Sequence, residues 1–310
     1  MLRTLRKMHI RPSVVGVPTH DCISFRINNV VNPELGNEGY LFEVNSDGIQ
    51  ISANSETGLF YGFSSFVQML PDDVCDVTYN KITIPECTIL DYPRYEWRGC
   101  MIDVSRHFFT VEQIKKMLDL MAIYKMNVFH WHLTDDQGFR VWIDRRPSVA
   151  IEGSVRRASE FGSLKEEGEY GGYYTAKQMK EIVDYCAERY ITVIPEFDMP
   201  GHFTAVLSAY PHLGCSGEKV EVEERFGIFD TIACGGNEEV YTFVYDVLKE
   251  MVEIFPSPFF HIGGDEAPKR RWAVCPKSLE KVKAVGLEGI EQLQGFFTKK
   301  VTEMLASLGK

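Results

Sequence analysis

The chain has 310 residues, of which 45% are hydrophobic, and its formal net charge at pH 7 is -11. A chain of this length and composition can bury one large core or two smaller ones, which is typical of a globular protein and not of a fibrous or low-complexity one. The excess of acidic groups repels phosphate backbones and anionic headgroups. The composition therefore argues against nucleic acid or a membrane as a partner.

The printed residues contain no run of eighteen apolar residues, and the opening MLRTLRKMHIRPSVV lacks the unbroken apolar segment of a signal peptide. The sequence thus predicts no membrane span or secretory signal and leaves the compartment open. Eight cysteines occur without a Cys-x-x-Cys pair, which favours buried free thiols. In an oxidising compartment, the expected disulfide joins Cys215 and Cys234, which flank a polar loop.

Residues 1–92 are interpreted as a small α+β domain. Short strand-like segments, two of them joined by a turn at Ser46-Asp47-Gly48, stand on either side of a segment with apolar residues at helical spacing. Ser55 or Thr57 can cap that helix. We expect an antiparallel sheet with the helix on one face. It is interpreted as a structural module, because it shows no cluster of titratable groups beside glycines.

From residue 93 to residue 310 the pattern changes to strand, loop and helix, repeated four times. The expected strand and helix pairs are 97–105 with 111–125, 126–134 with 175–190, 191–199 with 238–255, and 259–266 with 289–309. A long polar loop is expected after the second strand. Apolar strands that alternate with amphipathic helices indicate an α/β fold with a parallel sheet covered on both faces.

Four such units fit either half of a (β/α)8 barrel or an open doubly wound sheet. In barrels, functional groups gather at the carboxyl ends of all strands, whereas an open sheet concentrates them at one switch point. Here polar residues follow all four expected strands. This distribution favours a barrel.

The strongest candidate for chemistry is the pair Asp265 and Glu266 in HIGGDEAPKRRW, directly after the fourth apolar run. Neighbouring strand residues point to opposite sides, but Gly263 and Gly264 let the backbone bend, so both acids can face one cavity. Two acids in one pocket resist joint ionisation, which leaves one as a proton donor and one as an anion. The alternative is a solvated or salt-bridged pair without a chemical role.

The segment HWHLTDD raises a metal hypothesis. His130 and His132 lie on one face of the expected strand, and His202, Asp198 or Asp265 could complete a hydrolytic metal site. No cysteine ligand and no helical His-Glu-x-x-His supports a metal. A hydrogen-bonded polar wall is therefore the competing interpretation.

Two other strand ends carry candidate groups. Arg106 in DVSRHF can offer a planar fork of donors to hydroxyls or a carboxylate, or it can pair with a neighbouring acid. In PEFDMPGH, two prolines and a glycine break the third strand and present Asp198 and His202. His202 could orient a carboxylic acid or satisfy loop backbone.

Four segments together carry a family resemblance. In this order and at these separations, YEWRGCMIDVSRHF, MNVFHWHLTDDQGFR, ITVIPEFDMPGH and FFHIGGDEAPKRRW resemble the β-N-acetylhexosaminidases of glycoside hydrolase family 20. The resemblance covers essentially the whole chain, since residues 1–92 are similar to the α+β domain that precedes the family's barrel.

The resemblance implies a retaining hydrolysis of terminal β-linked N-acetylglucosamine or N-acetylgalactosamine, without cofactor or metal, in which the substrate's acetamido oxygen is the nucleophile. Glu266 would be the general acid and then the base, and Asp265 would orient the acetamido N–H. Arg106 would donate to sugar hydroxyls, and Asp135 and His202 would form a relay toward Glu266. The supporting residues would be Asp198 and His261.

The chain departs from the family pattern after the fourth unit. No fifth to eighth strand precedes Lys310, whereas the later strands of family members supply aromatic residues that enclose the sugar. We therefore expect a truncated barrel that turns over weakly or not at all by itself and that could self-associate through open strand edges. The rival functions are a metal-dependent hydrolase that uses His130 and His132, and a noncatalytic carbohydrate-binding fragment.

Overall fold

The computed structural model describes residue 8 and residues 22–310, so most of the opening segment lies outside the described residues. The chain forms two compact units. The first holds the described residues up to Gly99 together with Lys116–Asn127 and Glu188–Ile191, and the second holds the remainder. Within the described residues, no helix combines the length and the apolar character that a membrane span requires.

The first unit contains a four-stranded sheet with the order β1-β3-β2-β4. Its strands are β1 (Cys22–Ile27), β2 (Tyr40–Asn45), β3 (Gly48–Ala53) and β4 (Cys87–Asp91). β2 pairs antiparallel with β3 and β4, whereas β1 runs parallel to β3. The sheet is thus mixed, where we predicted an antiparallel one. Alternation of apolar and polar residues defines the faces of a strand but not the direction of its neighbour.

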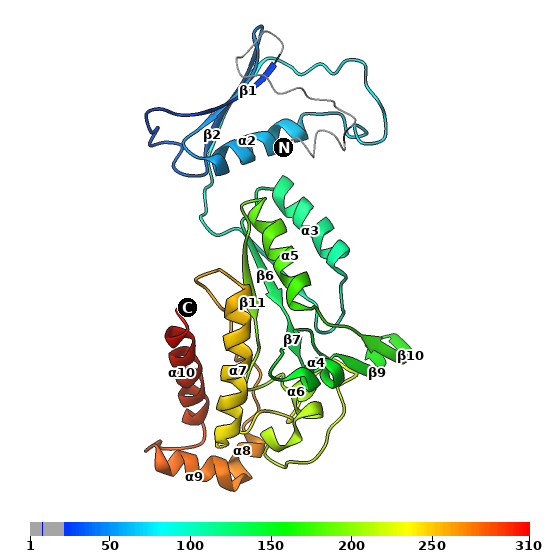
Figure 1. Ribbon diagram of the computed structural model, residues 1–310, viewed down its shortest axis with the longest axis vertical. Coiled ribbons are helices and arrows are strands. Elements are labelled where there is room, and N and C mark those ends of the chain that lie inside the picture. Colours follow the sequence, from blue (N-terminus) through cyan, green and yellow to red (C-terminus); the bar gives the residue numbers. More distant parts are fainter. Residues whose placement is uncertain (1–7, 9–21) are drawn as a thin grey trace. The chain divides into compact units, whose positions relative to one another are not determined.

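Helix α2 (Glu56–Gln68) packs on this sheet (Figure 1). Ser55 is its N-cap, and the Ser55 hydroxyl oxygen accepts a hydrogen bond from the Gly58 N–H. Gly62 brings the helix close to the sheet, since a Cβ atom there would lie 2.4 Å from Ile51 Cγ2. The buried core of this unit includes Tyr40, Phe42, Ile51, Phe63 and Phe66.

The second unit has the α/β architecture that the sequence predicts. Its main sheet has the order β11-β6-β5, formed by β5 (Gly99–Asp103), β6 (Val128–His132) and β11 (Thr192–Glu196). β6 and β11 pair in parallel. Three of the four predicted helices lie in this unit as α5 (Ala176–Ala187), α7 (Glu238–Ile254) and α10 (Gln292–Ser307). The fourth is present as α3 (Val111–Ile123), whose residues from Lys116 onward belong to the first unit. Helices α7 and α10 lie side by side (Figure 1).

The fourth predicted strand is reduced to a single bridge between His261 and Glu196. The His261 N–H donates to the Pro195 carbonyl, and the Phe197 N–H donates to the His261 carbonyl. Pro256 and Pro258 precede this segment, and proline has no N–H to offer a sheet ladder. The bridge still sets His261 beside the end of β11.

The segment predicted as a long polar loop contains regular structure. It holds β7 (Thr134–Asp135), β8 (Gly138–Phe139), α4 (Pro147–Gly153) and the antiparallel hairpin of β9 (Val155–Phe161) and β10 (Leu164–Gly171). Strand β10, LKEEGEYG, is exposed along almost its whole length, so it lacks the apolar alternation on which a strand prediction depends. The remaining short helices are α6 (Thr204–Ala209), η1 (Pro211–Leu213), α8 (Arg270–Val274) and α9 (Pro276–Ala284).

Candidate active site

A cavity of about 350 Å³ in the second unit is lined mainly by residues in or just after the strands. Seven of the residues singled out from the sequence line it, namely Arg106, His130, His132, Asp135, Asp198, His261 and Asp265. The carboxyl ends of parallel strands meet at one edge of a sheet, which explains why residues far apart in the sequence converge there.

His202 joins the two adjacent acids to the interior of the unit. Its Nε2 atom lies 3.4 Å from Glu266 Oε2 and 3.9 Å from Asp265 Oδ2. Its Nδ1 atom lies 3.0 Å from Asp135 Oδ1 and 3.1 Å from Asp136 Oδ2. Asp265 and Glu266 thus face one imidazole, although Glu266 is not among the residues that line the cavity.

The charge of His202 follows from its carboxylate partners. Burial lowers the pKa of the imidazole, but hydrogen bonds to Asp135 and Asp136 outweigh burial and raise that pKa to about 11. A protonated imidazole donates from both ring nitrogens. His202 can therefore donate to Asp135 or Asp136 through Nδ1 and to Glu266 through Nε2 at the same time.

Asp135 is the buried acceptor of three cationic groups. Its Oδ2 lies 2.5 Å from Arg106 Nη1 and 2.9 Å from His132 Nε2, and its Oδ1 faces His202. Burial acts to raise the pKa of Asp135, but these partners hold it below its usual value. Arg106 Nη1 also lies 2.9 Å from Asp103 Oδ2. The ion pair that we considered for Arg106 is therefore formed, and it fixes the guanidinium at the cavity wall.

Glu196, in the third expected strand, is a member of the site to which the sequence assigns no role. Its Oε2 lies 2.5 Å from His130 Nε2 and 2.7 Å from His132 Nδ1, and its Oε1 lies 3.0 Å from His261 Nδ1. Burial opposes ionisation, but the three imidazoles hold the pKa of Glu196 far below its usual value. The pairing of Glu196 with His132 follows from the register of β11 against β6, which the sequence does not give.

The carboxylates of Asp135 and Glu196 raise the pKa values of the histidines that they contact. Burial lowers the pKa of His132, but hydrogen bonds to Asp135 and Glu196 raise it to about 10. The hydrogen bond to Glu196 raises the pKa of His261. His130 and His132 approach the same carboxylate oxygen. This geometry is that of the polar wall, the interpretation that competed with a metal site.

Gly263 and Gly264 are required by a close approach to Asp198. A Cβ atom on Gly263 would lie 1.7 Å from Asp198 Oδ1, and the φ angles of the two glycines are +60° and +110°. The Gly264 N–H donates to Asp198 Oδ1 at 2.9 Å. The two glycines thus let the backbone bend, as the sequence predicts, and they bring it close to the Asp198 side chain. The bend leads to Glu266, whose φ of 45° lies in the left-handed region.

The residues of this site lie in a part of the chain that matches a known protein family. The description of the catalytic domain of glycosyl hydrolase family 20 matches residues 95–310, and that of domain 2 of the same family matches residues 2–92. The chain belongs to glycoside hydrolase family 20. The family resemblance drawn from the four motifs is confirmed, and all the site residues described above fall within the matched catalytic domain.

Individual family-20 proteins agree with this assignment. A beta-hexosaminidase of Porphyromonas gingivalis is 40% identical over 314 residues, covering 100% of this chain and 39% of that protein. A crystal structure of a beta-N-acetylhexosaminidase matches with a TM-score of 0.84 and 34% identity, covering 94% of this chain and 61% of that one. The exo beta-N-acetylglucosaminidase of Vibrio harveyi, in complex with N-acetylglucosamine, matches with a TM-score of 0.83 and 30% identity, at 100% and 48% coverage.

The chain spans only part of the length of these relatives. It covers between 39% and 55% of the first three curated beta-hexosaminidases that it matches.

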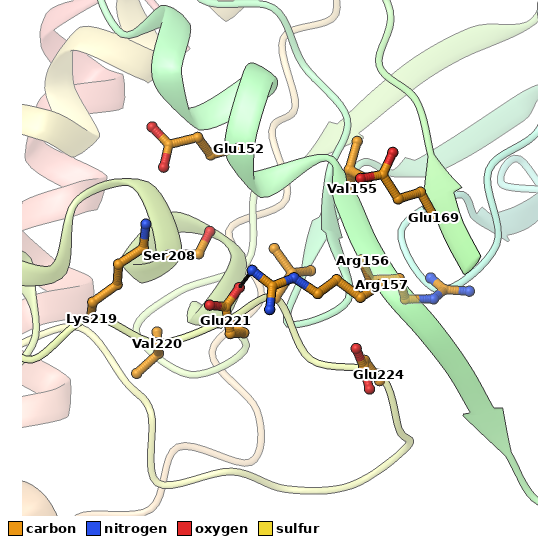
Figure 2. A pocket seen from close by; sticks show the side chains of 11 residues that line it. Glu152, Val155, Arg156, Arg157, Glu169, Ser208, Lys219, Val220, Glu221 and Glu224 are labelled. Atoms are coloured by element: carbon orange, nitrogen blue, oxygen red, sulfur yellow. Dashed lines mark ion pairs between the residues drawn. The ribbon is translucent and has the colours of Figure 1, made fainter. Parts of the chain in front are cut away.

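A second cavity, of about 230 Å³, lies elsewhere in the second unit (Figure 2). It is lined by residues of α4, β9, β10, α6 and the segment 219–224, and it includes none of the candidate residues named from the sequence. Figure 2 shows Arg157 and Glu221 directed toward each other, and their charged atoms lie 3.3 Å apart. Arg157 and Glu221 of this cavity pair with each other, and neither Asp265 nor Glu266 lines it.

The ionisation of Asp198 should make the free energy of unfolding of the second unit depend on pH. Burial raises the pKa of Asp198 to about 7 from its usual value of 3.8, although the Gly264 N–H and His202 act in the opposite direction. The protonated acid therefore stabilises the fold fully below about pH 4, and this contribution is lost as the pH rises toward 7. We expect Asp198→Asn to gain stability relative to the unchanged protein over that window, on the order of 4 kcal/mol.

Urea unfolding of both proteins in steps from pH 4 to pH 8 measures this difference. The difference in unfolding free energy should rise up to about pH 7 and then stay level. A difference that does not change with pH would show that Asp198 ionises in the folded protein as it does in the unfolded chain.

Proposed function

We propose that the protein containing this chain hydrolyses terminal β-linked N-acetylglucosamine or N-acetylgalactosamine with retention of configuration, using the substrate's acetamido group as the nucleophile. The observation that supports this most strongly is that Asp265 and Glu266 face the same buried imidazole at a strand-end cavity of a family-20 catalytic domain. The N-acetylglucosamine complex of the Vibrio harveyi relative supports the choice of sugar.

In the first step, Glu266 donates a proton to the glycosidic oxygen while the acetamido oxygen attacks the anomeric carbon. The bond to the leaving group breaks, and an oxazolinium ring forms on the sugar. Asp265 accepts a hydrogen bond from the acetamido N–H and stabilises the positive charge that develops there. In the second step, Glu266 takes a proton from water, and the water opens the oxazolinium ring at the anomeric carbon.

The residues around the two acids act by position and charge. His202 lies within 3.4 Å of Glu266 and is held by Asp135 and Asp136, so it can fix the carboxyl group in one orientation. Arg106 is fixed by Asp103 and Asp135 at the cavity wall. The remaining donors of its planar guanidinium suit sugar hydroxyls.

The proposal is tested with two chromogenic substrates that differ only at carbon 2. The full-length protein that carries this sequence should hydrolyse p-nitrophenyl N-acetyl-β-glucosaminide. It should hydrolyse p-nitrophenyl β-glucoside at least about 1,000-fold more slowly, because the nucleophile is then missing and its effective concentration is lost. Comparable rates on the two substrates would show that the nucleophile belongs to the protein.

A further inference from the structure

Three cysteines of the second unit converge outside the cavity that Asp265 lines. Cys215 follows η1, Cys234 precedes α7, and Cys275 is the N-cap residue of α9. No disulfide joins any of the eight cysteines, all of which lie in the described part of the chain. The sulfur atoms of Cys215, Cys234 and Cys275 all lie within 4.8 Å of one another. The disulfide that we considered between Cys215 and Cys234 is absent, and the thiol of Cys275 lies beside these two thiols.

The spacing of the sulfur atoms distinguishes two kinds of site. Cys234 Sγ and Cys275 Sγ lie 3.6 Å apart. In a tetrahedral zinc site with Zn–S bonds of about 2.3 Å, two sulfur atoms lie about 3.8 Å apart. A disulfide requires about 2.05 Å. The observed separation is therefore close to the edge of a zinc tetrahedron.

A fourth polar atom completes the group. Ser278 Oγ lies 3.7 Å from Cys234 Sγ, and Ser278 is fully buried. The segment Cys275-Pro-Lys-Ser278 opens α9, so it places the hydroxyl one helical turn from the Cys275 thiol. This spacing is the same as in the Cys-x-x-Cys pairs of structural zinc sites.

The backbone holds these groups in place. The Cys234 N–H donates to the Leu213 carbonyl at 2.9 Å, and Gly214 bridges to Ala233. A Cβ atom on Gly236 would lie 2.2 Å from the backbone of Lys277, so this loop packs directly on the first turn of α9. The thiols thus belong to a rigid frame. Cys234 and Cys275 are buried, whereas Cys215 is half-buried and leaves a path for an ion.

Zinc binds cysteine as the thiolate, so binding of the ion at this cluster would displace the thiol protons.

We propose that Cys215, Cys234 and Cys275 bind one Zn²⁺ ion as three thiolate ligands, with the Ser278 hydroxyl or a water molecule at the fourth position. The ion would be structural, because it would join three segments that are distant in sequence and stabilise the folded state by binding it alone. Trp272 of α8 donates to the Ala233 carbonyl at 2.8 Å. Because Ala233 precedes Cys234, this bond links the metal site to the segment that follows Glu266, and the ion stabilises that segment. The ion takes no part in the proposed hydrolysis.

The test uses the full-length protein, reduced and stripped of metal, and titrates it with cobalt(II) chloride and then with zinc chloride. We expect thiolate-to-cobalt and tetrahedral d–d absorption bands that saturate at one ion per chain and are abolished by zinc. Zinc should also raise the unfolding temperature of the protein. Absence of these absorption bands would overturn the proposal.

Variants separate this site from other thiols. Cys234→Ser should weaken cobalt binding on the order of 100-fold, whereas Ser278→Cys should tighten it on the order of 10-fold by supplying a fourth thiolate. Cys22→Ser, in the first unit, is the matched control and should change nothing. If Cys234→Ser fails to fold, the Ser278→Cys result alone decides, and an unchanged affinity in that variant would contradict the proposal.

A disulfide is the outcome that would replace zinc. Protein purified without reductant should contain one zinc ion per chain, and the thiols of Cys215, Cys234 and Cys275 should be released by chelation. Peptide mapping that finds Cys234 joined to Cys215 or to Cys275 in freshly purified protein, with no bound zinc, would overturn the proposal.

Discussion

Replacing Glu266 by Gln should lower kcat for glycosides with poor leaving groups by about 10²–10⁴-fold, because the amide has the shape of the acid but no proton to donate. For an activated leaving group such as 2,4-dinitrophenolate, which departs without protonation, the loss should be far smaller. The measurement is kcat for a series of aryl N-acetyl-β-glucosaminides in the full-length protein, plotted against the pKa of the leaving phenol.

The matched control is Glu291→Gln, which changes an exposed acid of the same unit that pairs with Lys269 at 3.8 Å. Its rates should stay within about twofold of those of the unchanged protein across the whole series. If Glu266→Gln instead lowers kcat equally for good and poor leaving groups, Glu266 is not the proton donor.

Replacing Arg140 by Met should lower the free energy of unfolding by about 3–5 kcal/mol. Arg140 is completely buried. Its guanidinium donates to the backbone carbonyls of Val104, Ser105, Ser154 and Gly172, which come from segments far apart in the chain. Burial lowers the pKa of Arg140 to about 10. The methionine side chain fills much of the space but leaves these carbonyls without donors.

Urea unfolding at neutral pH measures this loss. The control is Arg145→Met, because the Arg145 side chain is 51% exposed and its ion pair with Asp246 is long at 3.5 Å. That change should cost no more than about 1 kcal/mol. Equal effects of the two substitutions would mean that the buried carbonyls find other partners when Arg140 is removed.

The sequence predicts the parts of this fold that are set by periodic apolar residues. The four predicted helices, α3, α5, α7 and α10, begin and end close to the expected positions, because each presents a regular apolar face. The parallel position of β1 and the hairpin of β9 and β10 were not predicted. β1 depends on tertiary pairing, and β10 is stabilised by its partner strand and not by burial of its own side chains.

The residues of the candidate site also fall into two groups, those that the sequence predicts and those that depend on tertiary packing. Asp265, Glu266, Asp198 and His202 could be singled out because glycines and prolines interrupt the chain beside them. The role of Glu196 could not, since it depends on strand register and on a bridge to His261. The approach of Cys275 to Cys234 likewise depends on packing between distant segments.

The most direct test of substrate-assisted hydrolysis varies the nucleophile itself. Substrates whose N-acetyl group carries zero, one, two or three fluorine atoms differ in the electron density of the amide oxygen and little in shape. If that oxygen attacks the anomeric carbon beside Asp265, log kcat/KM of the full-length protein should fall with each added fluorine. A rate that is independent of fluorination would contradict this mechanism and assign the nucleophile to the protein or to water.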